Sequence, residues 1–249
     1  MDHKIIGTTM PVLEITLQPG ESIISEAGEL SWMTQAIELE TTTQKAGGGG
    51  LFGAVKRVAG GGSLFMTEYE AKGGSGMVAF ATKVPGEIIS IDVSPRSTYM
   101  IHRHGFLCGT DQIELSVGFQ QSLGAGVFGG TGFRLQKVAG TGTAWIELDG
   151  ELVTYDLSPG ERLRVHPGHV GMFEDTVSFD ITRLKGIKNM IFGGDGIFLA
   201  ELTGPGKVWL QSLPLANLAH ALSEYMTTNT TEAAGTGAVV GSILRGMSS

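Results

Sequence analysis

Leu13-Glu14-Ile15-Thr16-Leu17-Gln18-Pro19-Gly20-Glu21 is the stretch of sequence that decides the fold. Apolar and polar side chains alternate in it up to the proline, which is typical of a strand with one buried face followed by a turn. The same pattern recurs at residues 89–97 and at residues 153–161, after offsets of 76 and then 64 residues. A pattern that returns at a fixed offset sets the architecture, so we predict three related units.

The offsets hold further along the chain, which argues against coincidence. A second alternating stretch, at residues 37–41, maps onto residues 113–117 at the offset of 76 and onto residues 177–181 after another 64. A Phe-Gly pair follows the same rule, beginning at residues 52, 128 and 192. Each unit is longer than a solenoid repeat and is long enough for a small β-sandwich.

We predict an all-β fold, because short strands at regular spacing with turn signals between them favour a sandwich or barrel over βαβ units. The predicted architecture is three tandem β-sandwich repeats of the double-stranded β-helix type about a pseudo-threefold axis, plus a short C-terminal helix. Pro214 suits the start of that helix. The predicted boundaries are residues 1–86 for repeat 1 with a Gly-rich insertion at 47–62, 87–150 for repeat 2, 151–213 for repeat 3, 214–226 for the helix and 227–249 for a flexible Gly/Thr-rich tail.

Composition narrows the class of protein. Of the 249 residues, 41% are apolar and 17% are charged, which is enough for a core and argues against disorder in the main body. The net charge of −8 gives no bulk attraction for nucleic acid phosphates, so we expect no nucleic acid partner. The N-terminus has no apolar signal region, and no stretch approaches the length of a membrane span. We therefore predict a cytoplasmic location.

The lone cysteine, Cys108, rules out an internal disulfide and fits a reducing compartment. In the repeat register it aligns with Trp32 and Met172, and free cysteine is among the most buried residue types. We therefore expect Cys108 at a core position.

Two glycine-rich stretches, at residues 48–53 and 124–129, match the Gly-x-Gly-x-x-Gly pattern of dinucleotide sites. Such a site needs a strand before the glycines and a long helix after them, and neither is expected here. The two stretches are also repeat equivalents, so a turn common to the units explains them. No Ser-His-Asp signature is present either, and we predict no cofactor and no catalytic residue.

Three polar residues at equivalent repeat positions suggest a metal site. Glu26, His102 and His166 are related by the offsets of 76 and 64, and three units around an axis would bring them together. Two histidines and a carboxylate are the ligand set of non-haem iron sites. His104, which shares a strand face with His102, is a further candidate. The competing interpretation places Glu26, His102 and His166 at strand ends or turns, at separate surface positions. We favour it and predict no metal site, because a side chain must lie almost on the axis to meet its equivalents.

The chain resembles a known family in two stretches. Gly47–Arg57, followed by Gly61–Thr67, is similar to the hallmark segment of the altered inheritance of mitochondria number twenty-four family, and so is the run from Pro19 to Met33. The resemblance implies a fold like three tandem copies of the subunit of the tryptophan-sensing RNA-binding attenuation protein. Fungal relatives support inner-membrane organisation in mitochondria, but this chain lacks an Arg- and Ser-rich transit peptide. The family supplies no catalytic residues.

The leading hypothesis is a non-enzymatic oligomeric scaffold or binding protein, because open sheet edges must be paired or covered. The alternative is a metal-dependent, cupin-like enzyme or small-ligand binder that uses Glu26, His102 and His166, or the pair His102 and His104. RNA binding is suggested by fold analogy alone, which is a weak argument for function. We expect a homo-oligomer. For residues 51–57 the favoured interpretation is a docked loop, and the alternative is a surface for a protein partner or a membrane.

Overall fold

The computed structural model describes residues 1–43, 65–121, 133–184, 197–215, 217–219, 221–223 and 225. The chain divides into two compact units, Met1–Leu213 and Pro214–Ser249. In the second unit the described residues from 215 to 225 are helical, and the carbonyl of Pro214 accepts the N–H groups of Asn217 and Leu218 at 2.9 and 3.1 Å. The predicted helix after Pro214 is therefore present.

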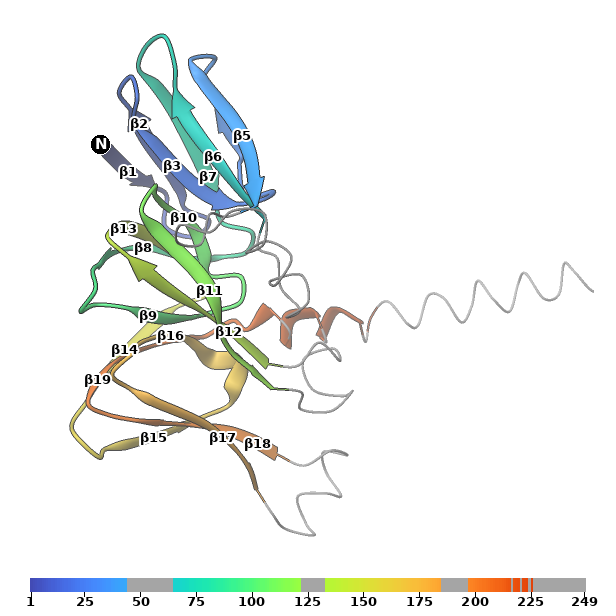
Figure 1. Cartoon of the computed structure of the whole chain (residues 1–249). Helices are drawn as coiled ribbons and strands as arrows, with labels where there is room; N and C mark the ends of the chain where they lie inside the picture. The colour runs from blue at the N-terminus through green and yellow to red at the C-terminus, as the bar shows by residue number, and fades with distance from the viewer. Residues whose placement is uncertain are drawn as a thin grey trace, which may run out of the picture. The chain divides into compact units, whose positions relative to one another are not determined.

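The described part of the first unit holds one N-terminal strand and three segments of six strands each (Figure 1). The N-terminal strand is β1 (Asp2–Ile6). The first segment contains β2 (Val12–Leu17), β3 (Ser22–Glu26), β4 (Trp32–Met33), β5 (Ile37–Thr43), β6 (Phe65–Ala71) and β7 (Gly76–Ala81). The second contains β8 (Gly86–Val93), β9 (Tyr99–His102), β10 (Phe106–Thr110), β11 (Ile113–Gln121), β12 (Phe133–Gly140) and β13 (Gly142–Asp149). The third contains β14 (Leu152–Leu157), β15 (Arg162–Val165), the 3-10 turn η2 (Pro167–His169), β16 (Val170–Glu174), β17 (Ser178–Leu184), β18 (Ile197–Thr203) and β19 (Gly206–Gln211).

One antiparallel pairing scheme recurs in all three segments. The sixth strand lies between the first and the third, and the fifth strand lies between the fourth and the second. The segments are joined because the second strand of one segment pairs with the third strand of the next, as β3 does with β10 and β9 with β16. The result is four sheets in the orders β1-β2-β7-β4, β5-β6-β3-β10-β13-β8, β11-β12-β9-β16-β19-β14 and β15-β18-β17, named sheets 1 to 4.

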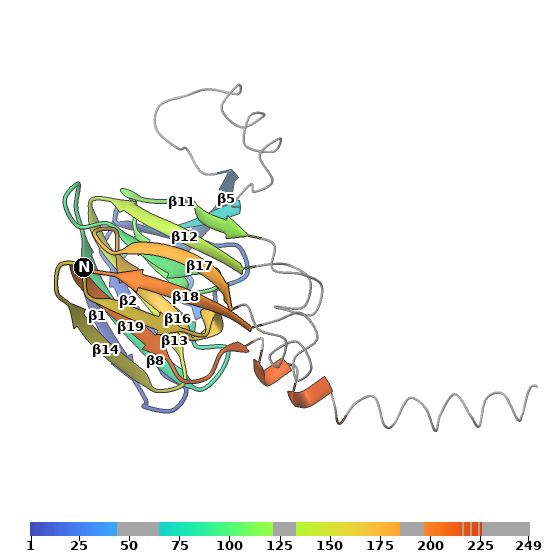
Figure 2. The same ribbon diagram turned by 90° about the horizontal axis from the view of Figure 1, so that it is seen from below.

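The four sheets stack as successive layers with one hydrophobic cluster in each of the three gaps. The clusters are identified by Phe80 with Trp145 between sheets 1 and 2, Ile146 with Met172 between sheets 2 and 3, and Phe173 with Leu202 between sheets 3 and 4. Figure 2 shows β17 and β18 lying over strands of sheet 3. Sheets 2 and 3 are therefore covered on both faces over much of their area.

This layering explains why strands differ in the burial pattern of their side chains. In the outer sheet 1, β2 alternates between buried and half-buried side chains, as the opening pattern predicts. In sheet 2, consecutive residues of β13 face opposite clusters, and six residues in a row are buried. A strand buried on both faces loses the alternation between core and solvent.

The all-β prediction is confirmed, and the described residues of the first unit form one compact body. The predicted repeat boundaries and the pseudo-threefold axis stay predictions. The Gly-rich insertion at 47–62, the proposed contact surface at 51–57 and the tail at 227–249 lie outside the described residues. Among the described residues, no helix has the length and apolar character needed to cross a membrane.

The repeat-equivalent tryptophans offer a test of the layered core. Trp145 is 2% exposed and packs between sheets 1 and 2, whereas Trp209 is only partly buried. The Trp145 indole N–H has no hydrogen-bond partner among the described residues, so truncation deprives no other group of one. We expect Trp145→Ala to lower the free energy of unfolding by about 3–5 kcal/mol, and Trp209→Ala to cost clearly less. Urea titration of both variants measures this, and equal losses would contradict the layer assignment.

Candidate functional site

The structure places Glu26, His102 and His166 at the same point of three equivalent turns. In each turn the backbone carbonyl of that residue accepts the N–H of the residue three positions later, at 3.4 Å for Glu26, 2.9 Å for His102 and 2.9 Å for His166. The turns follow β3, β9 and β15, which are the second strands of the three segments. The register inferred from the sequence is therefore matched at these turns.

The three side chains nevertheless do not meet. The Glu26 carboxylate accepts a hydrogen bond from the Gln136 amide, and the His166 ring packs edge-on against the His169 ring at a centroid distance of 5.9 Å. Among the described residues, no three or more His, Cys, Asp or Glu side chains are grouped as metal ligands. The physical reason is that β3, β9 and β15 belong to sheets 2, 3 and 4, and stacked sheets lie about 10 Å apart.

His102 is half-buried by surface area, and its ring is held by protein groups. Its Nε2 lies 3.0 Å from the carbonyl oxygen of Glu147, and a Cβ at Gly105 would lie 2.8 Å from the ring. Desolvation lowers the pKa of His102 to about 4, against a weaker opposing effect of the hydrogen bond to Glu147. His102 therefore has a structural role in its turn, because its ring is neutral and one ring nitrogen contacts a backbone carbonyl.

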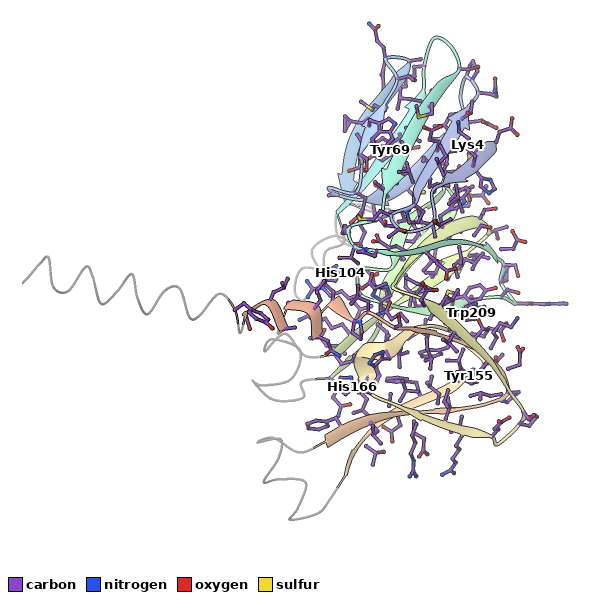
Figure 3. The ribbon with its side chains drawn as sticks, turned by 180° about the vertical axis from the view of Figure 1, so that it is seen from behind. Lys4, Tyr69, His104, Tyr155, His166 and Trp209 are labelled. Atoms are coloured by element: carbon purple, nitrogen blue, oxygen red, sulfur yellow. The ribbon has the colours of Figure 1, made fainter. Side chains whose placement is uncertain are left out.

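Of the other histidines near these turns, His169 makes the same kind of contact with a described residue and His104 does not. His104 is exposed in the turn after β9, and Figure 3 shows it well separated from His166. His169 Nδ1 lies 2.8 Å from the carbonyl oxygen of Gln211, a residue equivalent to Glu147 at the offset of 64. His169 thus takes the role in the third segment that His102 takes in the second.

Glu147 is a buried acid that sequence reasoning missed. Its Oε1 accepts the N–H of Lys83 at 2.8 Å, while its Oε2 has no hydrogen-bond partner among the described residues. Desolvation raises the pKa of Glu147 to about 7, against opposing effects of Lys83. In the third segment the equivalent Gln211 makes the same bond without a charge, since its Oε1 accepts the N–H of Asp149 at 3.1 Å. The repeat offset of 64 relates Glu147 to Gln211, so the sequence could have shown that a carboxyl stands where the next segment has an amide.

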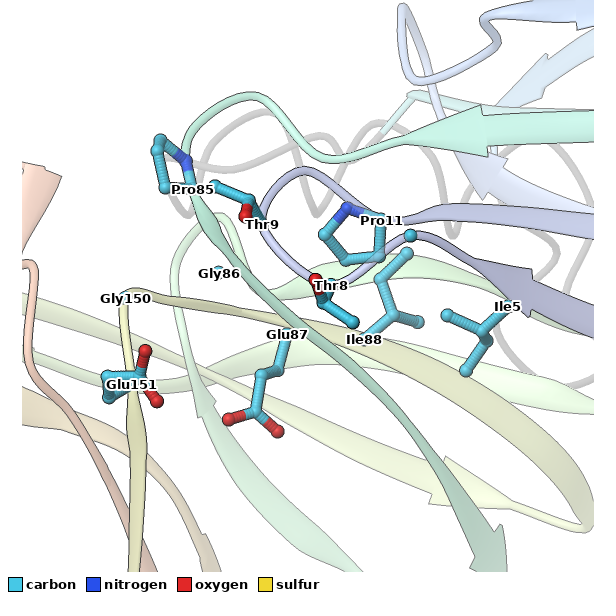
Figure 4. A pocket seen from close by; sticks show the side chains of 11 residues that line it. Ile5, Thr8, Thr9, Pro11, Pro85, Gly86, Glu87, Ile88, Gly150 and Glu151 are labelled. Atoms are coloured by element: carbon cyan, nitrogen blue, oxygen red, sulfur yellow. The ribbon is translucent and has the colours of Figure 1, made fainter.

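A pocket of about 500 Å³ lies where the β1–β2 turn meets the start of β8 and the turn after β13 (Figure 4). Glu87 and Glu151 contribute carboxylates, and Thr8 and Thr9 contribute hydroxyl groups. The Glu87 Oε1 already accepts the N–H of Leu152 at 3.3 Å. The lining contains no histidine, cysteine, lysine or arginine, so its ionisable side chains are the two carboxylates.

The strand edges at the two ends of the stack are the most informative surface. At both segment junctions a second strand pairs with a third strand, but β15 pairs only with β18 and β4 only with β7 among the described residues. The β4 side chains Trp32 and Met33 are 45% and 37% exposed. Their register equivalents, such as Cys108 and Met172, are fully buried, as expected for Cys108 from the sequence. Among the described residues, β4 and β15 thus lack the neighbouring strand that their equivalents have at the segment junctions.

The chain is similar to known proteins both in sequence and in structure. The family described as "Mitochondrial biogenesis AIM24" matches residues 3–213. An uncharacterized protein of Streptococcus pyogenes serotype M6 is 27% identical over 224 residues, covering 88% of each chain. The crystal structure of a Streptococcus pyogenes protein from a structural genomics consortium superposes with a TM-score of 0.71 at 25% identity, covering 90% of this chain and 99% of that one.

The buried acid predicts an unusual pH dependence. A carboxyl whose pKa is raised on folding stays protonated in the folded chain between about pH 4.5 and pH 7, so Glu147 lowers stability as pH rises through that window. We expect Glu147→Gln, which keeps the bond to Lys83, to be more stable than the wild type by roughly 1–3 kcal/mol at pH 8 and no more stable at pH 4. Urea unfolding at the two pH values measures the difference.

The matched control is Glu114→Gln, which changes an exposed carboxylate on β11. This variant should shift stability by the same small amount at both pH values. If Glu147→Gln lost stability equally at pH 4 and pH 8, the assignment of Glu147 as a buried, uncompensated acid would be wrong.

Proposed function

The chain belongs to the mitochondrial biogenesis AIM24 family, as its glycine- and phenylalanine-rich stretch indicated, and we propose that it acts as a non-enzymatic scaffold built from several identical chains. Unpaired N–H and C=O groups along a sheet edge are a template for pairing with another chain. The observation that carries the proposal is the pair of open edges on β4 and β15. Within the chain, every other strand in these two positions is paired across a segment junction.

The described residues give the metal-dependent alternative little support. The candidate ligands Glu26, His102 and His166 end strands of three different sheets, and His102 is engaged with a backbone carbonyl. A scaffold needs binding surfaces more than it needs a reactive centre, and the strand edges supply such surfaces. Contact of residues 51–57 with a protein partner or a membrane surface stays a prediction.

Edge pairing can be tested with a proline that affects only outward-facing backbone groups. The N–H of Gly204 bonds to the carbonyl of Glu161, and antiparallel pairs alternate, so the N–H of Arg164 points away from β18. Arg164→Pro should therefore keep the backbone bonds of sheet 4 and remove one donor from the open edge. It also removes the ion pair of Arg164 with Glu201, while Arg162 keeps its own ion pair with Glu201. We expect the wild type to be an oligomer by size-exclusion chromatography with light scattering, and the variant to dissociate at about tenfold higher concentration or above.

Ser90→Pro is the control on a different edge. The N–H of Gly150 bonds to the carbonyl of Pro85, so by the same alternation the N–H of Ser90 points outward from β8, at the edge of sheet 2. Ser90→Pro should leave the assembly intact, and circular dichroism should show both variants folded. A wild type that stays monomeric at all accessible concentrations would overturn the scaffold proposal.

A further inference from the structure

We infer that β15 of one chain pairs with β4 of a second copy, antiparallel, with Arg164 opposite Met33. The inference rests on the proposed oligomer and specifies its interface. It follows from the topology of the four sheets, the register of the two junctions inside the chain and the exposure of particular side chains.

The first argument is the order of strands in the sheets. Sheets 2 and 3 each join three strands of one segment to three strands of the next, in the same relative order. Sheet 4 holds only the first half of such a sheet, as β17-β18-β15, and sheet 1 holds only the second half, as β4-β7-β2, with β1 added. Pairing β15 with β4 of a second copy would give β17-β18-β15-β4-β7-β2-β1. The two incomplete sheets are therefore complementary parts of one composite sheet.

The second argument fixes the register. At the first junction Ile24 lies opposite Gly109, and at the second Met100 lies opposite Phe173. These pairs are related by the offsets of the repeat, since 24 + 76 = 100 and 109 + 64 = 173. The equivalent of Met100 in the third segment is Arg164, 64 residues later. The equivalent of Phe173 in the first segment is Met33, which lies 140 residues earlier, the sum of the two offsets. The repeat therefore places Arg164 opposite Met33. The pair Ile101 and Met172 leads in the same way to Val165 opposite Trp32.

The third argument is the burial of β4. Trp32 lies opposite Ala79 within its own segment, as Cys108 lies opposite Trp145 and Met172 opposite Trp209. Cys108 and Met172 are fully buried because a neighbouring segment covers them, while Trp32 is 45% exposed. A large aromatic side chain at a position that is otherwise buried is a typical anchor of an interface.

The fourth argument is the uncovered part of sheet 3. Val153 and Tyr155 on β14 are 45% and 43% exposed, and they share a face with Leu157, which packs in the cluster between sheets 3 and 4. The repeat equivalent of Tyr155 is Ile91, which is 7% exposed in the cluster between sheets 2 and 3. Sheet 4 has three strands and sheet 3 has six. Sheet 1 of the second copy would lengthen sheet 4 over the Val153–Tyr155 face.

These arguments identify a second copy of this chain as the occupant of both edges. The two edges differ from each other, so the contact is head-to-tail, and each copy keeps one free edge until the assembly closes. A symmetric contact of β15 with β15 would place the arginines of the two copies close together, and it would leave β4 uncovered.

Single-cysteine variants test the register directly. The native Cys108 is buried, so a cysteine introduced at the edge is the reactive thiol. Arg164→Cys chains are mixed with Met33→Cys chains, dissociated by dilution, reconcentrated and treated with a short thiol-specific cross-linker. We expect a two-chain band on denaturing gels in the mixture, at least fivefold stronger than with either variant alone.

The matched control uses Arg162→Cys in place of Arg164→Cys. Arg162 is also an exposed arginine of β15 paired with Glu201, but it lies two residues off the inferred register. It should cross-link to Met33→Cys much more weakly, because Cα atoms two residues apart along a strand are separated by roughly 6–7 Å. Equal cross-linking of the two arginine positions would overturn the register.

Light scattering on the same mixtures tests whether an oligomer forms at all, separately from whether β15 and β4 form its interface. An oligomer that forms but gives no cross-link between residues 164 and 33 would overturn this interface and leave the scaffold proposal standing. Wild-type chains that remain monomers would overturn both. An oligomer that cross-links at residues 164 and 33, and dissociates in the Arg164→Pro variant, is the expected result.

Discussion

Backbone pairing across the segment junctions is the constraint on which the rest of this structure depends. A single segment would have two half-sheets, each with an open edge and each too narrow to cover its neighbour. When β3 pairs with β10, two half-sheets become one six-stranded sheet, and both faces of that sheet acquire a cluster of apolar side chains. The same happens where β9 meets β16. The core of the protein is thus a consequence of edge pairing, because the clusters lie between shared sheets.

Sharing sheets between segments has an electrostatic consequence. A strand covered on both faces leaves its polar side chains no route to water, so they must find backbone partners or remain neutral. Gln211 meets this requirement with an amide, which is neutral and accepts a backbone N–H. Glu147 also accepts a backbone N–H, but with a carboxyl whose pKa is raised to about 7. The two residues bond to equivalent backbone N–H groups, of Asp149 and Lys83. The bond to the backbone N–H therefore does not require the charge of Glu147, since Gln211 makes it without one. The ionisable carboxyl makes the Glu147 position more sensitive to pH than the Gln211 position.

The sequence predicted local features well and long-range ones poorly, for physical reasons. The alternation at residues 13–17 matches β2, because one face of that strand lies outside the cluster between sheets 1 and 2. The offsets also placed Glu26, His102 and His166 in equivalent turns. Pairing between the units was expected, but alternation does not tell which strand is the neighbour, so the pairs β3 with β10 and β9 with β16 could not be named from the sequence. The metal hypothesis was sound in register, but the three turns belong to different sheets, and the described residues form no group of three metal ligands there. In β13, Glu147 looks like a solvent-facing residue until both faces are known to be covered.

The open edges themselves show why association should be specific. β4 has two residues and β15 has four, which is too short to template pairing with an arbitrary strand. On β15, Arg162 and Arg164 both reach Glu201, at 3.2 and 2.9 Å, so the edge carries charge held in a fixed position. Short, charged edges are how proteins avoid edge-to-edge aggregation. An edge of this kind pairs well only where the rest of the partner also fits, and the apolar surface beside it on β14 provides that second requirement. The same features that protect the free chain from random pairing therefore select a partner that continues the stack.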